Sequence, residues 1–185
     1  MSVGSLIQNT FLLYFSKPAA DRNLYAAIKG KKIRSCLELG INSVLRTQRL
    51  FEVLSWEPEN LPLKYTGIDL FEAAGSKQHP SLKQAFHDIR HPSVKVQLVP
   101  GDIYSALVRT ANQLPATDLV LIGAGHDPEV LTRAWIYVPR MLGPHSLVYQ
   151  EQLDNKGECS GFKQLSVNEI QKLAHSASRS QRRAA

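Results

Sequence analysis

Short apolar runs rich in β-branched residues alternate with amphipathic segments along most of this chain. The runs, each about the length of a buried strand, span residues 33–39, 63–69, 94–99, 118–122 and 146–150. The segments between them, whose apolar residues have helical spacing, span residues 44–56, 81–90, 103–114 and 128–142. Strands that alternate with helices predict a parallel sheet with right-handed crossovers.

The two ends of the chain extend this pattern. Apolar spacing from Ile7 to Phe15 indicates one helix, and Pro18 indicates the start of a second helix that ends at Gly30. Residues 162–165 suggest a further strand, and a capping-box pattern precedes a helix over residues 167–174. We therefore expect an α/β fold, a three-layer Rossmann-like sandwich with a mostly parallel sheet of six or seven strands and helices on both faces.

The chain is predicted to be organised as a single domain followed by a tail. The domain spans residues 1–176, with N-terminal helices in 1–30 and a nucleotide-binding core in 31–152. Residues 177–185 are rich in Ser, Gln, Ala and Arg, and we expect a basic, disordered tail there.

Charge and composition exclude several classes of protein. A formal net charge of +6 and a pI of about 9.4 favour phosphate ligands. However, three of the Arg residues fall in the tail and a group of three Lys residues surrounds Gly30, with no interleaved aromatic residues, so we expect no nucleic-acid partner. No apolar run reaches the roughly 20 residues that span a bilayer, and the two cysteines have no Cys or His neighbours at ligand spacing. A soluble, cytoplasmic protein without a disulfide framework is the expectation.

Two acids stand at the ends of the first two apolar runs. Glu38 is followed by Gly40, and Asp69 ends the run that contains Gly67. Open α/β sheets bind nucleotide-like ligands beyond the carboxyl ends of their strands, and an ionised carboxylate can accept both hydroxyls of a ribose. Asp69 is therefore the strongest single candidate for ligand binding, although a turn or helix-cap role would use the same residue type.

Four segments in order resemble the motifs of the class I S-adenosylmethionine-dependent methyltransferases, over roughly residues 16–152. They are Glu38-Leu39-Gly40, Gly67-Ile68-Asp69, Gly101-Asp102-Ile103, and the fourth run with its loop, Thr117 to His126. In that family the first loop passes beneath the methionine part of the cofactor, the second acid binds the ribose, and the third segment lies near the adenine. The resemblance implies S-adenosyl-L-methionine as cofactor, contacted by Glu38, Gly40, Asn42, Ser43, Asp69, Leu70, Asp102, Ile103 and Gly123.

The chain departs from the family pattern in two places. The family's first loop continues with two more glycines, whereas this chain continues with Ile41, Asn42 and Ser43. Asn tolerates a left-handed conformation and Ser can cap the following helix, so the turn itself stays feasible. Where metal-dependent O-methyltransferases carry an acid after the fourth strand, this chain has Gly123, and we expect no metal.

The resemblance implies a methyltransferase that acts on an unidentified small molecule. His126 is the one histidine at a predicted strand end, which makes it the candidate general base, although capping of the next helix or a hydrogen bond to a loop carbonyl is the favoured interpretation. A catalytically inactive methyltransferase-like module for binding or assembly is the alternative. A nicotinamide-binding protein ranks last because the chain lacks the G-x-G-x-x-G fingerprint. A homodimer stays open.

Overall fold

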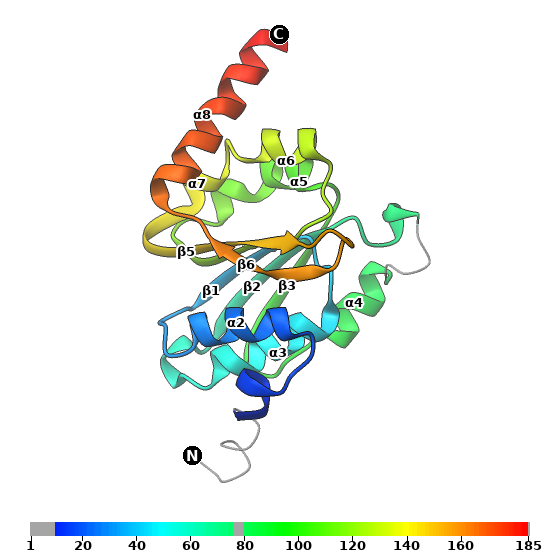
Figure 1. Cartoon of the computed structure of the whole chain (residues 1–185), viewed down its shortest axis with the longest axis vertical. Coiled ribbons are helices and arrows are strands. Elements are labelled where there is room, and N and C mark those ends of the chain that lie inside the picture. Colours follow the sequence, from blue (N-terminus) through cyan, green and yellow to red (C-terminus); the bar gives the residue numbers. More distant parts are fainter. Residues whose placement is uncertain (1–9, 76–79, 185) are drawn as a thin grey trace.

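A six-stranded sheet forms the centre of the protein (Figure 1). The structure is a computed structural model and describes residues 10–75 and 80–184. The sheet has the order β3-β2-β1-β4-β5-β6, and every pairing is parallel except that of β6 with β5. The strands are β1 (Ser35–Leu39), β2 (Leu63–Asp69), β3 (Val94–Pro100), β4 (Thr117–Ile122), β5 (Leu142–Leu153) and β6 (Cys159–Gln164).

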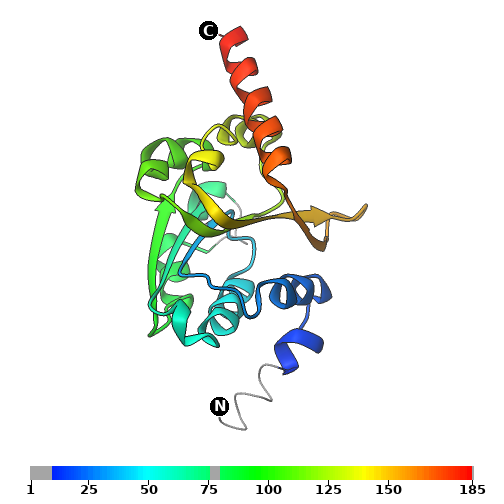
Figure 2. The ribbon, with the colours of Figure 1, turned by 90° about the vertical axis from the view of Figure 1, so that its left-hand side faces the viewer.

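Helices cover both faces of this sheet (Figures 1 and 2). One face carries α2 (Ala19–Ile28), α3 (Val44–Ser55) and α4 (Leu82–Asp88). The other carries α5 (Ile103–Thr110), α6 (Pro128–Ala134), α7 (Val138–Met141) and α8 (Val167–Ala184). Short 3-10 turns lie at η1 (Pro58–Asn60), η2 (Phe71–Ala74) and η3 (Ala111–Gln113). This arrangement confirms the predicted three-layer, mostly parallel α/β fold.

The central strands are buried on both faces, which explains why they form continuous apolar runs in the sequence. Leu37 and Leu39 of β1 belong to the core beneath α5–α8, whereas Cys36 belongs to the core beneath α2 and α3. Because side chains alternate along a strand, Glu38 points toward the α2 and α3 face. A carboxylate is thereby directed into the protein interior.

The C-terminal helix is longer than the sequence indicated. α8 runs through residue 184, so the expectation of a disordered tail from residue 177 is wrong for the residues that the structure describes. Its start has the predicted capping box, in which the Ser166 amide donates to Glu169 Oε2 at 2.8 Å and the Glu169 amide to Ser166 Oγ at 3.3 Å. Ile170 and Ala177 are buried, so α8 packs on the domain beyond the predicted end of the helix. The sequence did not indicate this because Ala is only a weak apolar signal.

Near the N-terminus, residues 10–14 are helical, as the apolar spacing predicted, whereas Ile7 lies outside the described residues. No helix within 10–75 and 80–184 has both the length and the apolar character needed to cross a membrane.

Candidate functional site at the carboxyl edge of the sheet

The ends of β1, β2 and β4 meet at one edge of the sheet. The Gly40 amide donates to Ile68 O at 2.8 Å, and the Gly123 amide donates to Leu39 O at 2.7 Å. The strand order reverses here, because β1 leads outward to β2 whereas β4 leads outward to β5. An open α/β sheet binds its ligand at such a switch point. The predicted site residues Gly40, Asp69 and Gly123 are thus brought together.

Asp69 ties two loops to this edge. Its Oδ2 accepts the Ile41 amide at 2.5 Å, and its Oδ1 accepts the Phe71 amide at 3.2 Å. The side chain is half-buried. An ionised carboxylate offers about four lone-pair positions, so each oxygen retains capacity for a ligand hydroxyl.

Glu38 is enclosed by side chains rather than by the loop. It is 1% exposed, and its Oε2 accepts Tyr65 Oη at 2.6 Å and Thr47 Oγ1 at 2.9 Å. The resemblance implied a cofactor contact for Glu38. In the structure the hydroxyl groups of Tyr65 on β2 and Thr47 on α3 donate to this carboxylate. Burial, reinforced by the Glu38 charge, raises the pKa of Tyr65 well above its usual value, so Tyr65 remains a donor.

Arg46 of α3 lies between two buried carboxylates. Its Nη2 is 3.4 Å from Glu38 Oε1, and its Nη1 is 2.8 Å from Glu151 Oε1 on β5. Burial alone would raise the pKa of Glu151, but the Arg46 charge and the donors Ala124 N–H and Asn42 lower it below its ordinary value. Neither Arg46 nor Glu151 was predicted from the sequence, because residues 105 positions apart give no local sign that the fold buries them together.

The loop after β1 is held by this buried ion network. Asn42 Nδ2 donates to Glu151 Oε2 at 2.7 Å and to Ala124 O at 2.9 Å, so its side chain reaches across to the loop after β4. Ser43 caps α3 by accepting the Arg46 amide at 3.2 Å. The turn therefore forms without the two additional glycines, as the residue types allowed.

Three glycines at this edge make room for the chain's own side chains. A Cβ on Gly40 would lie 2.6 Å from His126 Cε1, and one on Gly123 would lie 2.8 Å from Asn42 Nδ2. A Cβ on Gly67 would lie 2.6 Å from Ile41 Cδ1. We expected the glycine after Glu38 to admit a ligand, but in this structure His126 covers it.

His126 is fixed by the backbone of β1. Its Nε2 is 3.0 Å from Leu39 O, and since a carbonyl can only accept, Nε2 carries the proton. Only Nδ1 is then free to accept a proton. His126 therefore ties the loop after β4 to the end of β1, with its ring against Gly40.

The remaining predicted residues have separate local roles. Asp102 caps α5, where its Oδ1 accepts the Ser105 amide at 2.9 Å. Partial burial opposes ionisation of Asp102, but the Ser105 amide and hydroxyl outweigh it and lower the pKa. The Ile103 side chain is buried in the core, whereas that of Leu70 is exposed.

The residues at this edge fit a nucleoside with an amino-acid group only in part. The half around Asp69 offers a half-buried carboxylate with free lone pairs, which suits a ribose. The half around Gly40 and Gly123, where a methionine moiety is expected, holds the side chains of His126 and Asn42. Among the described residues, no group of three or more His, Cys, Asp and Glu side chains could hold a metal ion.

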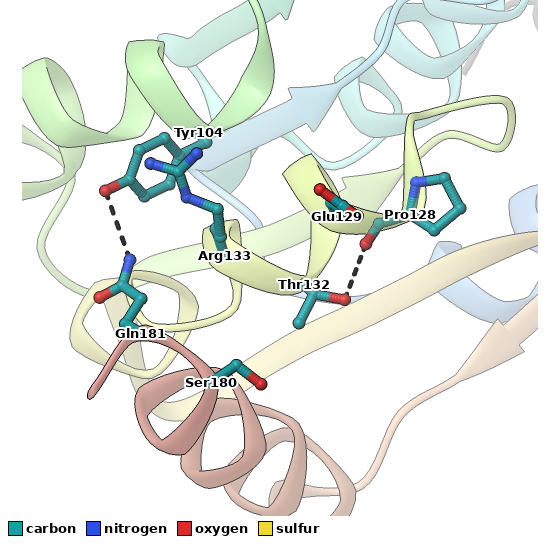
Figure 3. A pocket seen from close by; sticks show the side chains of 7 residues that line it. All are labelled: Tyr104, Pro128, Glu129, Thr132, Arg133, Ser180 and Gln181. Atoms are coloured by element: carbon teal, nitrogen blue, oxygen red, sulfur yellow. Dashed lines mark hydrogen bonds between the residues drawn. The ribbon is translucent and has the colours of Figure 1, made fainter. Parts of the chain in front are cut away.

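A surface hollow of about 790 Å³ lies between α5, α6 and α8 (Figure 3). Its lining residues are Tyr104, Pro128, Glu129, Thr132, Arg133, Ser180 and Gln181. The guanidinium of Arg133 stacks over the Tyr104 ring, 3.9 Å from its centroid, and Gln181 Nε2 donates to the Tyr104 hydroxyl at 3.4 Å. The hollow shares no lining residue with the predicted cofactor positions.

Comparison with known proteins relates this chain to others by fold. The sequence matches no family model and no curated protein. The precorrin-6y C5,15-methyltransferase of Geobacter metallireducens GS-15 aligns at a TM-score of 0.53 and 13% identity, over 76% of this chain and 65% of that one. A TehB-like SAM-dependent methyltransferase of Corynebacterium glutamicum aligns at 0.50 and 13% identity, over 94% and 80%.

The methyltransferase MycE of the mycinamycin pathway aligns at only 0.45, too low to support an argument, with 17% identity over 80% of this chain. The chain spans 34% of MycE and 65% of the Geobacter protein, so it is shorter than both. The two higher-scoring alignments show that the chain shares the Rossmann-like fold of these two methyltransferases. This confirms the resemblance at the level of fold.

Proposed function

We propose that this chain binds S-adenosylmethionine at the carboxyl edge of β1, β2 and β4 and transfers a methyl group to a small molecule. The observation that carries the proposal is Asp69, a half-buried carboxylate at the end of β2 beside the topological switch point. The fold supports it, since the TehB-like neighbour is described as SAM-dependent.

In this proposal Asp69 accepts the ribose hydroxyls with the lone pairs that Ile41 and Phe71 leave free. Leu70 and the backbone around Asp102 border the adenine, while Gly40, Asn42, Ser43 and Gly123 border the methionine part. When bound, the cofactor supplies a methyl group activated by a sulfonium. The protein's contribution is to hold the acceptor in line with that group and to exclude water. His126 could accept a proton only at Nδ1 while Nε2 donates to Leu39 O.

A second candidate function is a methyltransferase-like binding module without catalysis. The specific observation in its favour is that His126 and Asn42 lie against Gly40 and Gly123, where the methionine part is expected. Such a module would bind a nucleoside at Asp69 without holding a methyl donor. It would need no proton acceptor.

Calorimetric titrations with S-adenosylmethionine, S-adenosylhomocysteine and adenosine distinguish the two. We expect all three to bind, and Asp69→Asn to weaken each by about 10-fold or more, since a hydrogen bond to a charged group contributes about 1.5–3 kcal/mol. Asp154→Asn is the matched control, because Asp154 also accepts two backbone amides, those of Lys156 and Glu158, in an exposed turn.

Binding of adenosine alone would favour the non-catalytic module. Absence of binding by all three compounds would overturn both functions. An equal loss in Asp69→Asn and Asp154→Asn would show that the effect does not come from a ribose contact.

A further inference from the structure

Helix α8 carries a row of Lys, His and Arg side chains along one side. Lys172, His175, Arg179 and Arg182 follow one another at spacings of three, four and three residues, and all four are exposed. Residues three and four apart lie on the same side of a helix. We call these four residues the α8 stripe. At a rise of about 1.5 Å per residue, the stripe is about 15 Å long.

The side of α8 opposite the stripe packs on the domain, so the stripe faces solvent. Ile170 and Ala177 are buried in the core that α6 and α7 share, and α8 contacts both helices. The last turns of α8 project beyond the rest of the fold (Figures 1 and 2). The stripe is therefore presented on a helix whose orientation is set by the domain.

The stripe's charges have no acidic partner among the side chains that the structure describes. Glu169 is the one acidic residue of α8, and it pairs with Lys163 of β6 at 2.7 Å. Within the described part of the chain, Lys172, Arg179 and Arg182 form no ion pair. Residues 167–184 contain four Lys and Arg residues against that one Glu, which accounts for half of the chain's net charge of +6.

Regularly spaced, unpaired cations with hydroxyl side chains beside them suit a row of phosphates. Ser176 and Ser180 are exposed on the same helix and can donate to phosphate oxygens. Duplex DNA carries about one charge per 1.7 Å of axis, so a 15 Å stripe runs beside several phosphates. Insertion into a lipid surface is disfavoured, because an interfacial helix needs a free apolar face and that of α8 is buried in the domain.

We propose that the α8 stripe binds the phosphate backbone of nucleic acid without reading bases. The expectation of no nucleic-acid partner assumed that these arginines belong to a disordered tail, whereas the structure aligns them on a packed helix. This binding is independent of the function proposed for the sheet edge. The site takes any duplex or single strand whose backbone can follow the helix.

Fluorescence anisotropy with short labelled DNA and RNA, duplex and single-stranded, tests the proposal. Three phosphate contacts predict a slope of about −2.7 in log K against log salt, or about 40-fold weaker binding between about 50 and 200 mM salt. The triple variant Lys172→Gln, Arg179→Gln, Arg182→Gln should lose most of this affinity and slope. The control variant Lys29→Gln, Lys95→Gln, Lys156→Gln removes the same charge from other exposed sites and should keep both.

Three results would overturn the proposal. One is no binding of any nucleic acid at low salt, and another is an equal loss in the stripe and control variants, which would reduce the effect to net charge. The third is binding of phosphatidylserine-containing vesicles in preference to nucleic acid. Circular dichroism of both variants establishes that α8 stays helical, and binding of S-adenosylhomocysteine should be unchanged in both.

Discussion

Replacement of Arg46 by Met provides the sharpest test of how the sheet edge is held. Arg46 is the cation between Glu38 and Glu151, and all three side chains are almost fully buried. Met is an unbranched apolar side chain with no charge, so the variant leaves both carboxylates without this counter-ion. The guanidinium's stacking over the Phe162 ring, 5.3 Å from its centroid, is lost as well.

Removal of one partner of a buried ion pair costs about 3–5 kcal/mol, because the other charge remains buried and uncompensated. Two carboxylates depend on Arg46, so we expect a loss at the upper end of this range. For a domain of this size, each kcal/mol lowers Tm by about 2–4 °C, which predicts a decrease of about 10 °C or more. Urea unfolding followed by tryptophan fluorescence measures the free energy directly.

The pH dependence distinguishes lost charge compensation from lost packing. In the wild type the pKa of Glu151 is depressed, so its contribution to stability is present at neutral pH and is lost as the pH falls below about 4.5. In Arg46→Met, burial without the cation raises the pKa of Glu151. The deficit of the variant should therefore be largest at neutral pH and shrink as the pH falls.

A compensating variant provides the control. Arg46→Met combined with Glu38→Gln and Glu151→Gln removes both stranded charges and should recover most of the lost stability. A loss below about 1 kcal/mol for Arg46→Met, typical of an exposed pair, would refute the buried network. So would a deficit that neither the two Gln substitutions nor acid relieves.

Three further predictions concern the same edge. Gly40→Ala should destabilise the fold by more than the roughly 1–2 kcal/mol that a left-handed conformation costs a non-glycine residue, because φ is +84° and the new Cβ would also clash with His126. In thermal melts, adding His126→Ala should recover the part of the loss that comes from this clash and not the backbone part. Asn42→Gly removes the side chain against Gly123 and should raise the affinity for S-adenosylhomocysteine several-fold by calorimetry, and an unchanged affinity would show that Asn42 blocks nothing. Asp21→Asn should stabilise the protein at neutral pH, because burial foremost raises the Asp21 pKa; the gain in urea unfolding should vanish as the pH falls toward 3.8, and a gain independent of pH would contradict this cause.

The sequence determined the layers and the edge at which a site forms. Apolar runs long enough for buried strands, separated by helical patterns, predict that β1 to β5 form a parallel sheet. This prediction needs no knowledge of the side-chain contacts. Because the carboxyl ends of parallel strands meet at one edge, Asp69, Gly40 and Gly123 could be brought together before any coordinates. Caps at Ser43 and Ser166 were readable as well, since a cap depends on residues only three apart.

Only the tertiary structure decided what surrounds those positions. Arg46 and Glu151 are 105 residues apart and have no local signal, because a pattern along the chain does not show which charged residues a fold will bury together. The same holds for Asn42 and His126, which reach across from neighbouring loops to glycines that sequence alone assigned to a ligand. The spacing of the basic residues of α8 is present in the sequence. These residues form one exposed row because Ile170 and Ala177 pack the other side of the helix onto the domain. Such packing, rather than helix propensity alone, stabilises most helices in proteins.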